Sequence, residues 1–243
     1  MTKLSVNINK LATLRNARGK NTPDVLAMTL DIIYYGAQGI TVHPRPDGRH
    51  IRTQDVYDIA AAIDVEFNIE GYPDQNFLQL VLDVKPTQCT LVPDLPHALT
   101  SNAGWQVSKH IDLLQKTVAT LRSHAIRTSL FIDPINITPA DIAALYKIQT
   151  DRVEFYTETY ADAYQTDMMQ QILHVYKNTA ISITNLGIAI NAGHDLNLHN
   201  LKYLIQEIPM ITEVSIGHAL VCDALYLGMR ETISQYLACL TSK

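Results

Sequence analysis

Short β-prone runs separated by helical stretches recur along this chain, and the runs carry polar residues at every second position. Val6-Asn7-Ile8-Asn9, Ile40-Thr41-Val42-His43 and Phe67-Asn68-Ile69-Glu70 show the alternation most clearly. Parallel strands that are buried on both faces normally read as nearly continuous apolar runs. We therefore expect one face of each strand to pack on helices and the other face to surround a polar interior.

Eight such runs alternate with helical patterns, which is typical of βαβ units and a parallel sheet. We expect strands at 4–9, 39–44, 66–71, 89–93, 127–133, 152–157, 187–193 and 213–218, and helices near 24–36, 52–63, 74–84, 108–123, 138–147, 161–179, 197–207 and 219–240. The 243 residues match the ~250 of a (β/α)8 barrel. The prediction is an α/β protein with a single TIM-barrel domain over residues 1–243 and additional short helices in its loops. An open, doubly wound sheet competes, but the Gly-rich fingerprint usual after its first strand is missing.

Composition narrows the possible classes of protein. No apolar run reaches the ~18 residues that cross a membrane. Cys89, Cys222 and Cys239 lack CxxC spacing and are expected to be free thiols in a reducing compartment, hence in the cytoplasm. Residues 1–52 carry eight Lys and Arg against three Asp, although the whole chain has a net charge of −5. This asymmetry favours a local anion site, and its lack of a long basic stripe disfavours nucleic acid.

Polar residues at the C-terminal ends of strands are the candidates for chemistry, because barrel active sites are built there. His43 and Glu70 end two neighbouring strands on the polar face, where a histidine and a carboxylate suit general acid–base catalysis at neutral pH. His194 follows a third strand. Each residue alone could form a structural hydrogen bond instead, but the three together favour an active site.

Two groups of residues favour phosphate binding. Pro44-Arg45-Pro46 restricts the backbone around a guanidinium that suits bidentate phosphate recognition, and Arg15 and Arg18 follow the first strand near the same mouth. Gly193 and Gly217 end the last two strands, where barrels often bind phosphate through backbone N–H groups and a helix N-terminus. No metal is expected, because the chain has no HxH or HExxH motif.

These residues resemble the pyridoxine 5′-phosphate synthase family of deoxyxylulose-dependent vitamin B6 biosynthesis. The resemblance covers nearly the whole chain. It rests on segments in matching order and spacing: Val6-Asn7-Ile8, Ala12-Thr13-Leu14-Arg15-Asn16-Ala17-Arg18-Gly19, Gly39-Ile40-Thr41-Val42-His43, Phe67-Asn68-Ile69-Glu70, Leu91-Val92-Pro93, Phe131-Ile132-Asp133-Pro134, Asn191-Ala192-Gly193-His194 and Ile216-Gly217-His218-Ala219.

The resemblance implies a homo-octameric barrel enzyme without metal or organic cofactor. Such an enzyme joins 3-amino-2-oxopropyl phosphate to 1-deoxy-D-xylulose 5-phosphate and yields pyridoxine 5′-phosphate, inorganic phosphate and water. His43 and Glu70 would act as bases and His194 as an acid. The residues that would hold the amino-ketone phosphate are Asn7, Arg18, the backbone at Asp195, Gly217 and His218. Those that would hold the deoxyxylulose phosphate are Asn9, Lys10, Arg45, His50 and Thr100.

The chain departs from the family pattern at a few positions. Many members have Asp-His where this chain has Asn9-Lys10, so residue 9 cannot be a base here. Tyr156 stands where members often have His, and Glu158 where they often have Gly. Asp195 follows His194 where others have Gly, and an added carboxylate near a bound phosphate is unfavourable unless it turns away.

Two other functions are compatible with such a barrel. A phosphosugar epimerase or aldolase would need a metal ion or a lysine at a strand's C-terminal end, and the sequence offers neither. A non-catalytic phosphate-ligand sensor would bind the same ligands and tolerate loss of His43 or Glu70. The presence of both residues favours the synthase.

Overall fold

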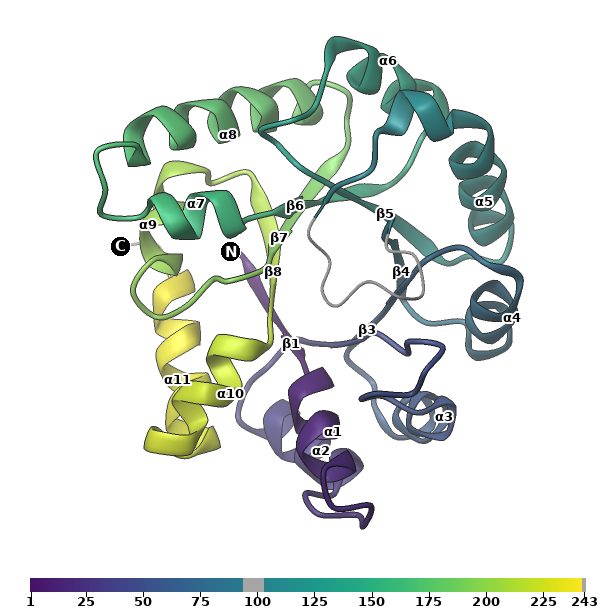
Figure 1. Cartoon of the computed structure of the whole chain (residues 1–243), viewed down its shortest axis with the longest axis vertical. Coiled ribbons are helices and arrows are strands. Elements are labelled where there is room, and N and C mark those ends of the chain that lie inside the picture. The colour runs from purple at the N-terminus through teal and green to yellow at the C-terminus, as the bar shows by residue number, and fades with distance from the viewer. Residues whose placement is uncertain (94–102, 242–243) are drawn as a thin grey trace.

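The structure, a computed structural model, describes residues 1–93 and 103–241, and its centre is a closed barrel of parallel strands (Figure 1). The strands are β1 Lys3–Asn7, β2 Gly39–Val42, β3 Glu66–Gly71, β4 Gln88–Leu91, β5 Arg127–Ile132, β6 Arg152–Tyr156, β7 Ala189–Gly193 and β8 Ile211–Ile216. Each strand pairs with the next in chain order, and β8 pairs with β1. This confirms the predicted (β/α)8 barrel.

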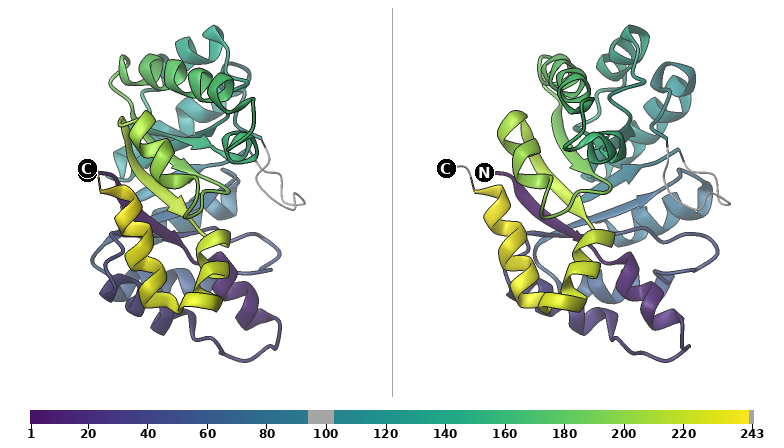
Figure 2. Two further views of the ribbon diagram at one scale, coloured as in Figure 1. Left: turned by 90° about the vertical axis from the view of Figure 1, so that its left-hand side faces the viewer. Right: turned by 60° about the vertical axis from the view of Figure 1, so that its left-hand side comes forward.

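Helices surround the barrel on its outside (Figure 1). They are α1 Asn9–Asn16, α2 Val25–Tyr34, α3 Thr53–Ala62, α4 Gln75–Val84, α5 Ile111–Ser123, α6 Pro139–Ile148, α7 Glu158–Ala163, α8 Met169–Thr184, α9 Leu201–Glu207, α10 His218–Leu227 and α11 Met229–Leu240, with a 3₁₀ turn η1 at Val107–His110. The last helix, α11, packs beside β1 and so completes the ring (Figure 2). Within the described residues, no helix has the length and apolarity that a membrane span requires.

Alternation along the strands sorts the side chains as the sequence predicts. The apolar set faces the helices and is at most 5% exposed: Val6, Ile8, Ile40, Val42, Phe67, Ile69, Ile188 and Ile190. The opposite faces fill the barrel with buried polar side chains, whereas barrel interiors are more often filled by Val, Ile and Leu. The buried polar set includes Ser5, Thr41, Asn68, Gln88, Thr90, Ser129, Glu154, Asn191 and Glu213.

A hydrogen-bonded chain satisfies part of this polar interior, since buried polar groups are costly without hydrogen bonds. Starting near the C-terminal ends of the strands, Asn68 donates to Glu70 (3.4 Å) and accepts from Thr90 (3.0 Å), and Gln88 donates to Thr90 (3.3 Å). Arg127 then donates to Gln88 (2.9 Å) and to Glu66, which also binds Lys3 at the N-terminal ends of the strands. The network links the two ends of the barrel on its β3–β5 side.

Sequence-coded caps begin several helices where predicted. Asp24 accepts from the backbone N–H of Ala27 (3.0 Å) at the start of α2. Thr138 caps α6, with Pro139 as its first residue and Asp141 closing the reciprocal capping box. Each cap fixes the residue at which its helix begins.

Three expectations about element boundaries were wrong. The first strand ends at Asn7, two residues early, because Asn7 Oδ1 accepts from Asn9 N (3.1 Å) and turns the chain into α1. The segment expected to be a loop is therefore helical. The helix expected near 219–240 is split by Gly228, whose φ of 78° ends α10. Likewise, Gln165 at φ 64° lies between α7 and α8, in the region expected as a single helix near 161–179.

Candidate active site

The first part of the site lies where β2 and β3 end. His43 follows the last residue of β2, and Glu70 lies near the end of β3. Their side chains converge, with His43 Nδ1 at 4.0 Å from Glu70 Oε2. Both residues are more than nine-tenths buried. The structure therefore brings this predicted pair together within reach of a common ligand.

Burial and neighbouring cations determine the charge of His43. Desolvation, followed by the charges of Arg45, His50 and Arg49, lowers the pKa of His43 to about 3. Burial and the charge of Arg45 also lower the pKa of His50 to about 4. Both rings are thus neutral at pH 7, the state in which a histidine accepts a proton.

The residues after β1 divide into supporting and surface groups. Asn9 Oδ1 accepts from the backbone N–H of His43 (2.9 Å), so Asn9 anchors the segment that carries this histidine. Lys10 is exposed, and its charge acts on His50. Arg18 is exposed beyond the C-terminal end of α1. Within the part of the chain that the structure describes, no side-chain hydrogen bond or ion pair joins Arg18 to the other candidate residues.

Arg15 corrects one expectation about the cations near the mouth. Its guanidinium is 2% exposed and binds Asp55 of α3 with N–O distances of 2.5 and 2.8 Å. It also donates to the backbone carbonyl of His50 (3.1 Å). Arg15 therefore fastens α1 to α3 and to the loop of His50, and its donors face protein acceptors.

The second part of the site lies where β7 and β8 end, and it depends on two glycines. A Cβ at Gly193 would lie 2.7 Å from Glu154 Oε1, and a Cβ at Gly217 would lie 3.0 Å from the backbone oxygen of Asn7. Gly217 is the N-cap of α10, and His218 is its first residue. Asn7, Gly217 and the free N–H groups of a helix N-terminus thus meet at one point, an arrangement suited to an anion.

His194 and Asp195 follow β7 with positive φ angles of 93° and 56°. Asp195 Oδ2 lies 2.7 Å from His194 Nδ1, and the Tyr156 ring meets the His194 ring edge-on at 4.9 Å. The Asp195 carboxylate is turned toward the histidine, the outcome that would let a phosphate approach the adjacent backbone. This hydrogen bond lowers the pKa of Asp195, which is therefore ionised at neutral pH.

Glu158 completes a small group around His194. One ligand atom each from Glu158, His194 and Asp195 lie within 4.8 Å of one another, a spacing that a divalent cation could use. The expectation of a metal-free enzyme stays a prediction, and removal of metal tests it directly.

Glu154 of β6 lies in the polar interior of the barrel and was not among the predicted site residues. Burial and then the charge of Glu213 raise its pKa to about 8, so its carboxyl is protonated at neutral pH. Among the described residues, Glu154 Oε2, Tyr156 Oη and Ser129 Oγ are buried and find no hydrogen-bond partner. A mid-strand carboxyl on the polar face of a barrel strand was the available signal.

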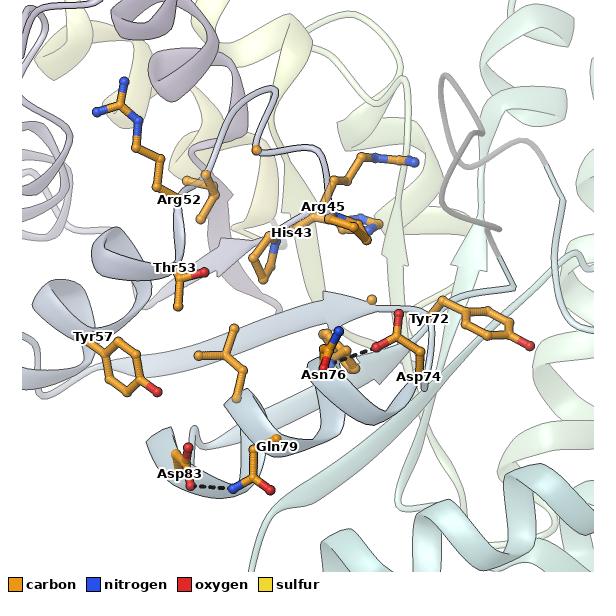
Figure 3. A pocket seen from close by; sticks show the side chains of 17 residues that line it. His43, Arg45, Arg52, Thr53, Tyr57, Tyr72, Asp74, Asn76, Gln79 and Asp83 are labelled. Carbon is orange, nitrogen blue, oxygen red and sulfur yellow. Dashed lines mark hydrogen bonds between the residues drawn. The ribbon is translucent and has the colours of Figure 1, made fainter.

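A pocket of about 620 Å³ opens from the first part of the site (Figure 3). It is lined by His43, Arg45 and residues of α3 and α4, with Arg45 and Tyr72 at one end and Tyr57 and Asp83 at the other. His194 and Gly217 do not line it, so this pocket covers only the β2–β3 part of the site. The predicted ligand Thr100 lies outside the described residues.

Comparison with known proteins gives the family. The model of the family described as "Pyridoxal phosphate biosynthesis protein PdxJ" matches residues 4–242. The chain belongs to this family. Relatives named pyridoxine 5′-phosphate synthase include that of Porphyromonas gingivalis, 55% identical over 237 residues, which cover 97% of this chain and 98% of the relative. That of Parabacteroides distasonis is 55% identical over 242 residues, which cover 100% of both chains. The chain is an enzyme of vitamin B6 biosynthesis.

More distant solved structures share the barrel. The 3-keto-L-gulonate-6-phosphate decarboxylase of Vibrio cholerae superimposes with a TM-score of 0.67 at 11% identity, covering 98% of this chain and 97% of that one. The N-(5′-phosphoribosyl)anthranilate isomerase of Pyrococcus furiosus gives 0.60 at 12% identity, covering 99% and 98%. At such identities the likeness shows the fold alone.

Proposed function

We propose that this chain is a pyridoxine 5′-phosphate synthase that condenses 3-amino-2-oxopropyl phosphate with 1-deoxy-D-xylulose 5-phosphate. The products are pyridoxine 5′-phosphate, inorganic phosphate and water. Membership of the family and the name that its relatives share, pyridoxine 5′-phosphate synthase, support this assignment. The observation that carries the mechanism is the convergence of neutral, buried His43 with Glu70 at the barrel mouth.

Proton transfer is the chemistry that this reaction needs. Ring closure requires imine formation, elimination of phosphate, tautomerisation and dehydration, and each step moves a proton. His43 and Glu70 accept protons from the condensing carbon and nitrogen centres. His194, beside the Asp195 carboxylate, donates a proton to a leaving oxygen. Three such groups around one barrel mouth allow the successive steps without release of an intermediate.

Two phosphorylated substrates require two anion sites, and the two parts of the mouth suit them. On the β7–β8 side, Asn7, Gly217, His218, the backbone at Asp195 and the more distant Arg18 hold the amino-ketone phosphate. On the β2–β3 side, Arg45, His50, Asn9 and Lys10 hold the deoxyxylulose phosphate, and the family resemblance adds Thr100, which lies outside the described residues. The electropositive surroundings of His43 and the N-terminus of α10 support this division.

The same proposal includes a homo-octamer in the cytoplasm. Exposed apolar side chains on α1, α2 and α10, among them Leu14, Tyr34 and Tyr226, favour burial against other copies. These helices lie side by side in the lower part of Figure 1. The three cysteines are free thiols, which suits a reducing compartment. Native mass spectrometry of the purified chain tests the octamer.

The proposed function is tested by the turnover of purified wild type and Glu70→Gln with both substrates. Pyridoxine 5′-phosphate is followed by its absorbance, with and without a chelator. We expect product from wild type in both conditions and a loss of about 10²–10⁴-fold in Glu70→Gln, with substrate binding retained, because removal of a general base costs this much.

Each contrary outcome points to a different alternative. No product from folded wild type that still binds both phosphorylated ligands would favour the sensor. Activity that the chelator abolishes would assign a metal ion to the reaction, for which Glu158, His194 and Asp195 offer ligands. Full activity in Glu70→Gln would remove Glu70 from the chemistry.

A further inference from the structure

The turn that carries His194 has an unusual backbone held by one side chain. Non-glycine residues at positive φ cost free energy, and His194 and Asp195 both lie there in succession. Thr157, fully buried after β6, donates from Oγ1 toward the carbonyls of Gly193 (2.9 Å) and His194 (2.6 Å). The neighbouring strand thus holds this turn in place. Such strain is retained where the surrounding structure fixes a functional side chain.

The imidazole of His194 is held from two directions. On one side its Nδ1 lies 2.7 Å from Asp195 Oδ2, and on the other the Tyr156 ring packs edge-on at 4.9 Å and 69°. The side chains of His194 and Asp195 are 27% and 42% exposed, so the pair borders solvent or a ligand. An ionised carboxylate can only accept a hydrogen bond, so this contact places the proton on Nδ1. Nε2 is then left to exchange a proton with another partner.

We propose that Asp195 is a positioning residue for His194, a role that rests on the proposed acid function of this histidine. The carboxylate accepts a hydrogen bond from Nδ1, fixes the orientation of the ring, and directs Nε2 toward the group with which it exchanges a proton. The backbone N–H of Asp195 remains directed to its own function in anion binding, because the negative side chain is occupied by the histidine.

Other charged groups around His194 are accounted for. Glu158 supplies a second carboxylate within 4.8 Å, and His218 of α10 acts on Asp195 through its charge. Tyr156 offers its ring, with a buried hydroxyl. Among these groups, Asp195 is the one whose side chain hydrogen-bonds the His194 ring. Glu158 therefore provides a matched control that removes a nearby charge and keeps the hydrogen bond.

The experiment compares wild type, Asp195→Gly, Asp195→Asn and Glu158→Gln. Glycine and asparagine both tolerate φ near 56°, so these variants remove the carboxylate without new backbone strain. Two readouts are taken: kcat and KM for both substrates, and the ring tautomer of neutral His194 from its ¹⁵N chemical shifts. Circular dichroism and thermal unfolding verify that each variant folds.

We expect Asp195→Gly to lower kcat by about 10- to 100-fold with KM changed by less than about threefold, since removal of an orienting partner typically costs this much. Its neutral His194 should lose the Nδ1–H tautomer that wild type shows. Asp195→Asn, which keeps an oxygen acceptor, should retain that tautomer and recover part of kcat. Glu158→Gln should retain the Nδ1–H tautomer of wild type, since it keeps the hydrogen bond between Asp195 and His194.

Two results would overturn the proposal. One is an unchanged tautomer in Asp195→Gly, and the other is a loss of kcat in Glu158→Gln as large as in Asp195→Gly. The tautomer readout does not depend on turnover. A wild type that shows the Nδ1–H tautomer but makes no pyridoxine 5′-phosphate would therefore support the Asp195–His194 contact and reject the synthase assignment.

Discussion

The β2–β3 side and the β7–β8 side of the barrel mouth each present a histidine, and the two rings have opposite electrostatic surroundings. His43 is more than nine-tenths buried and lies among Arg45, Arg49 and His50. His194 is more exposed, and the carboxylate of Asp195 lies 2.7 Å from its Nδ1. Burial and cations favour a neutral ring, whereas carboxylates favour a charged one.

This difference shows how one residue type can supply both a base and an acid at the same pH. Environments that separate the protonation states of two similar groups are the usual means of dividing acid and base roles. The proposed roles of His43 as base and His194 as acid follow the surroundings of each ring, so each role can be challenged by changing its surroundings.

The largest expected effect comes from removing the ring on the cationic side. His43→Gln should lower kcat/KM by about 10²–10⁴-fold, because it deletes a general base. Steady-state kinetics with both substrates measure the loss. His124→Gln, at the exposed C-terminal end of α5, removes a histidine outside the mouth and should retain wild-type rates. Equal losses in the two variants, or none in His43→Gln, would contradict the role of His43.

A smaller effect is expected from changing the surroundings of His43 while its ring is kept. After burial, Arg45 contributes most to lowering the pKa of His43 to about 3. Arg45→Gln should raise this pKa toward its ordinary value of 6.5, so neutral His43 is lost at a higher pH. The acidic limb of the kcat/KM profile should move upward by about one pH unit. KM for 1-deoxy-D-xylulose 5-phosphate should rise by about tenfold, because a phosphate contact is removed.

Arg52→Gln is the matched control for this shift. Arg52 lines the same pocket but is exposed and is not among the charges that lower the pKa of His43. Its profile should coincide with that of wild type over a range that includes the acidic limb, from about pH 3 upward. An acidic limb that stays in place in Arg45→Gln, or that moves equally in Arg52→Gln, would show that the cations do not set the charge of His43.

Much of the fold could be predicted from the sequence, because period-two alternation and strand–helix order are local patterns. The polar barrel interior, for example, follows from the parity of Asn68 and Glu70 alone. The start of α1 did not follow, because it depends on an Asx turn at Asn7 within a run that still alternates like a strand. The helix breaks at Gly228 and Gln165 depend on single positive φ angles that longer apolar periodicity conceals.

Candidate residues of the site could be predicted from the sequence, but the contacts between them could not. Strand ends predicted His43, Glu70 and His194, but no local pattern could show that Arg15 is committed to Asp55 of α3, 40 residues away. The same applies to Asn9, whose side chain holds the backbone of His43. The raised pKa of Glu154 arises from burial and Glu213, which only the closed barrel brings near.

The smallest expected effect concerns the stability of the fold, and it arises from Glu154 in the barrel interior below the mouth. Glu154 has a folded-state pKa of about 8, above its ordinary value of 4.5. Its contribution to stability is therefore fully present below pH 4.5 and is lost as pH rises to 8, since only the unfolded chain releases the proton in that range. Glu154→Gln mimics the protonated carboxyl and should remove this loss. Its free energy of unfolding at pH 9 should exceed that of wild type by on the order of a few kcal/mol, with little difference at pH 5.

Urea denaturation at pH 5 and pH 9 measures this difference. Glu207→Gln, on α9 at the outside of the barrel, controls for the loss of one carboxylate and should follow wild type at both pH values. If Glu154→Gln loses as much stability toward pH 9 as wild type does, the Glu154 carboxyl of wild type is already ionised inside the folded barrel. The β6–β7 side of wild type would then carry one more negative charge beneath His194. The contrast with the cationic surroundings of His43 would then arise from Glu154 as well as from Asp195.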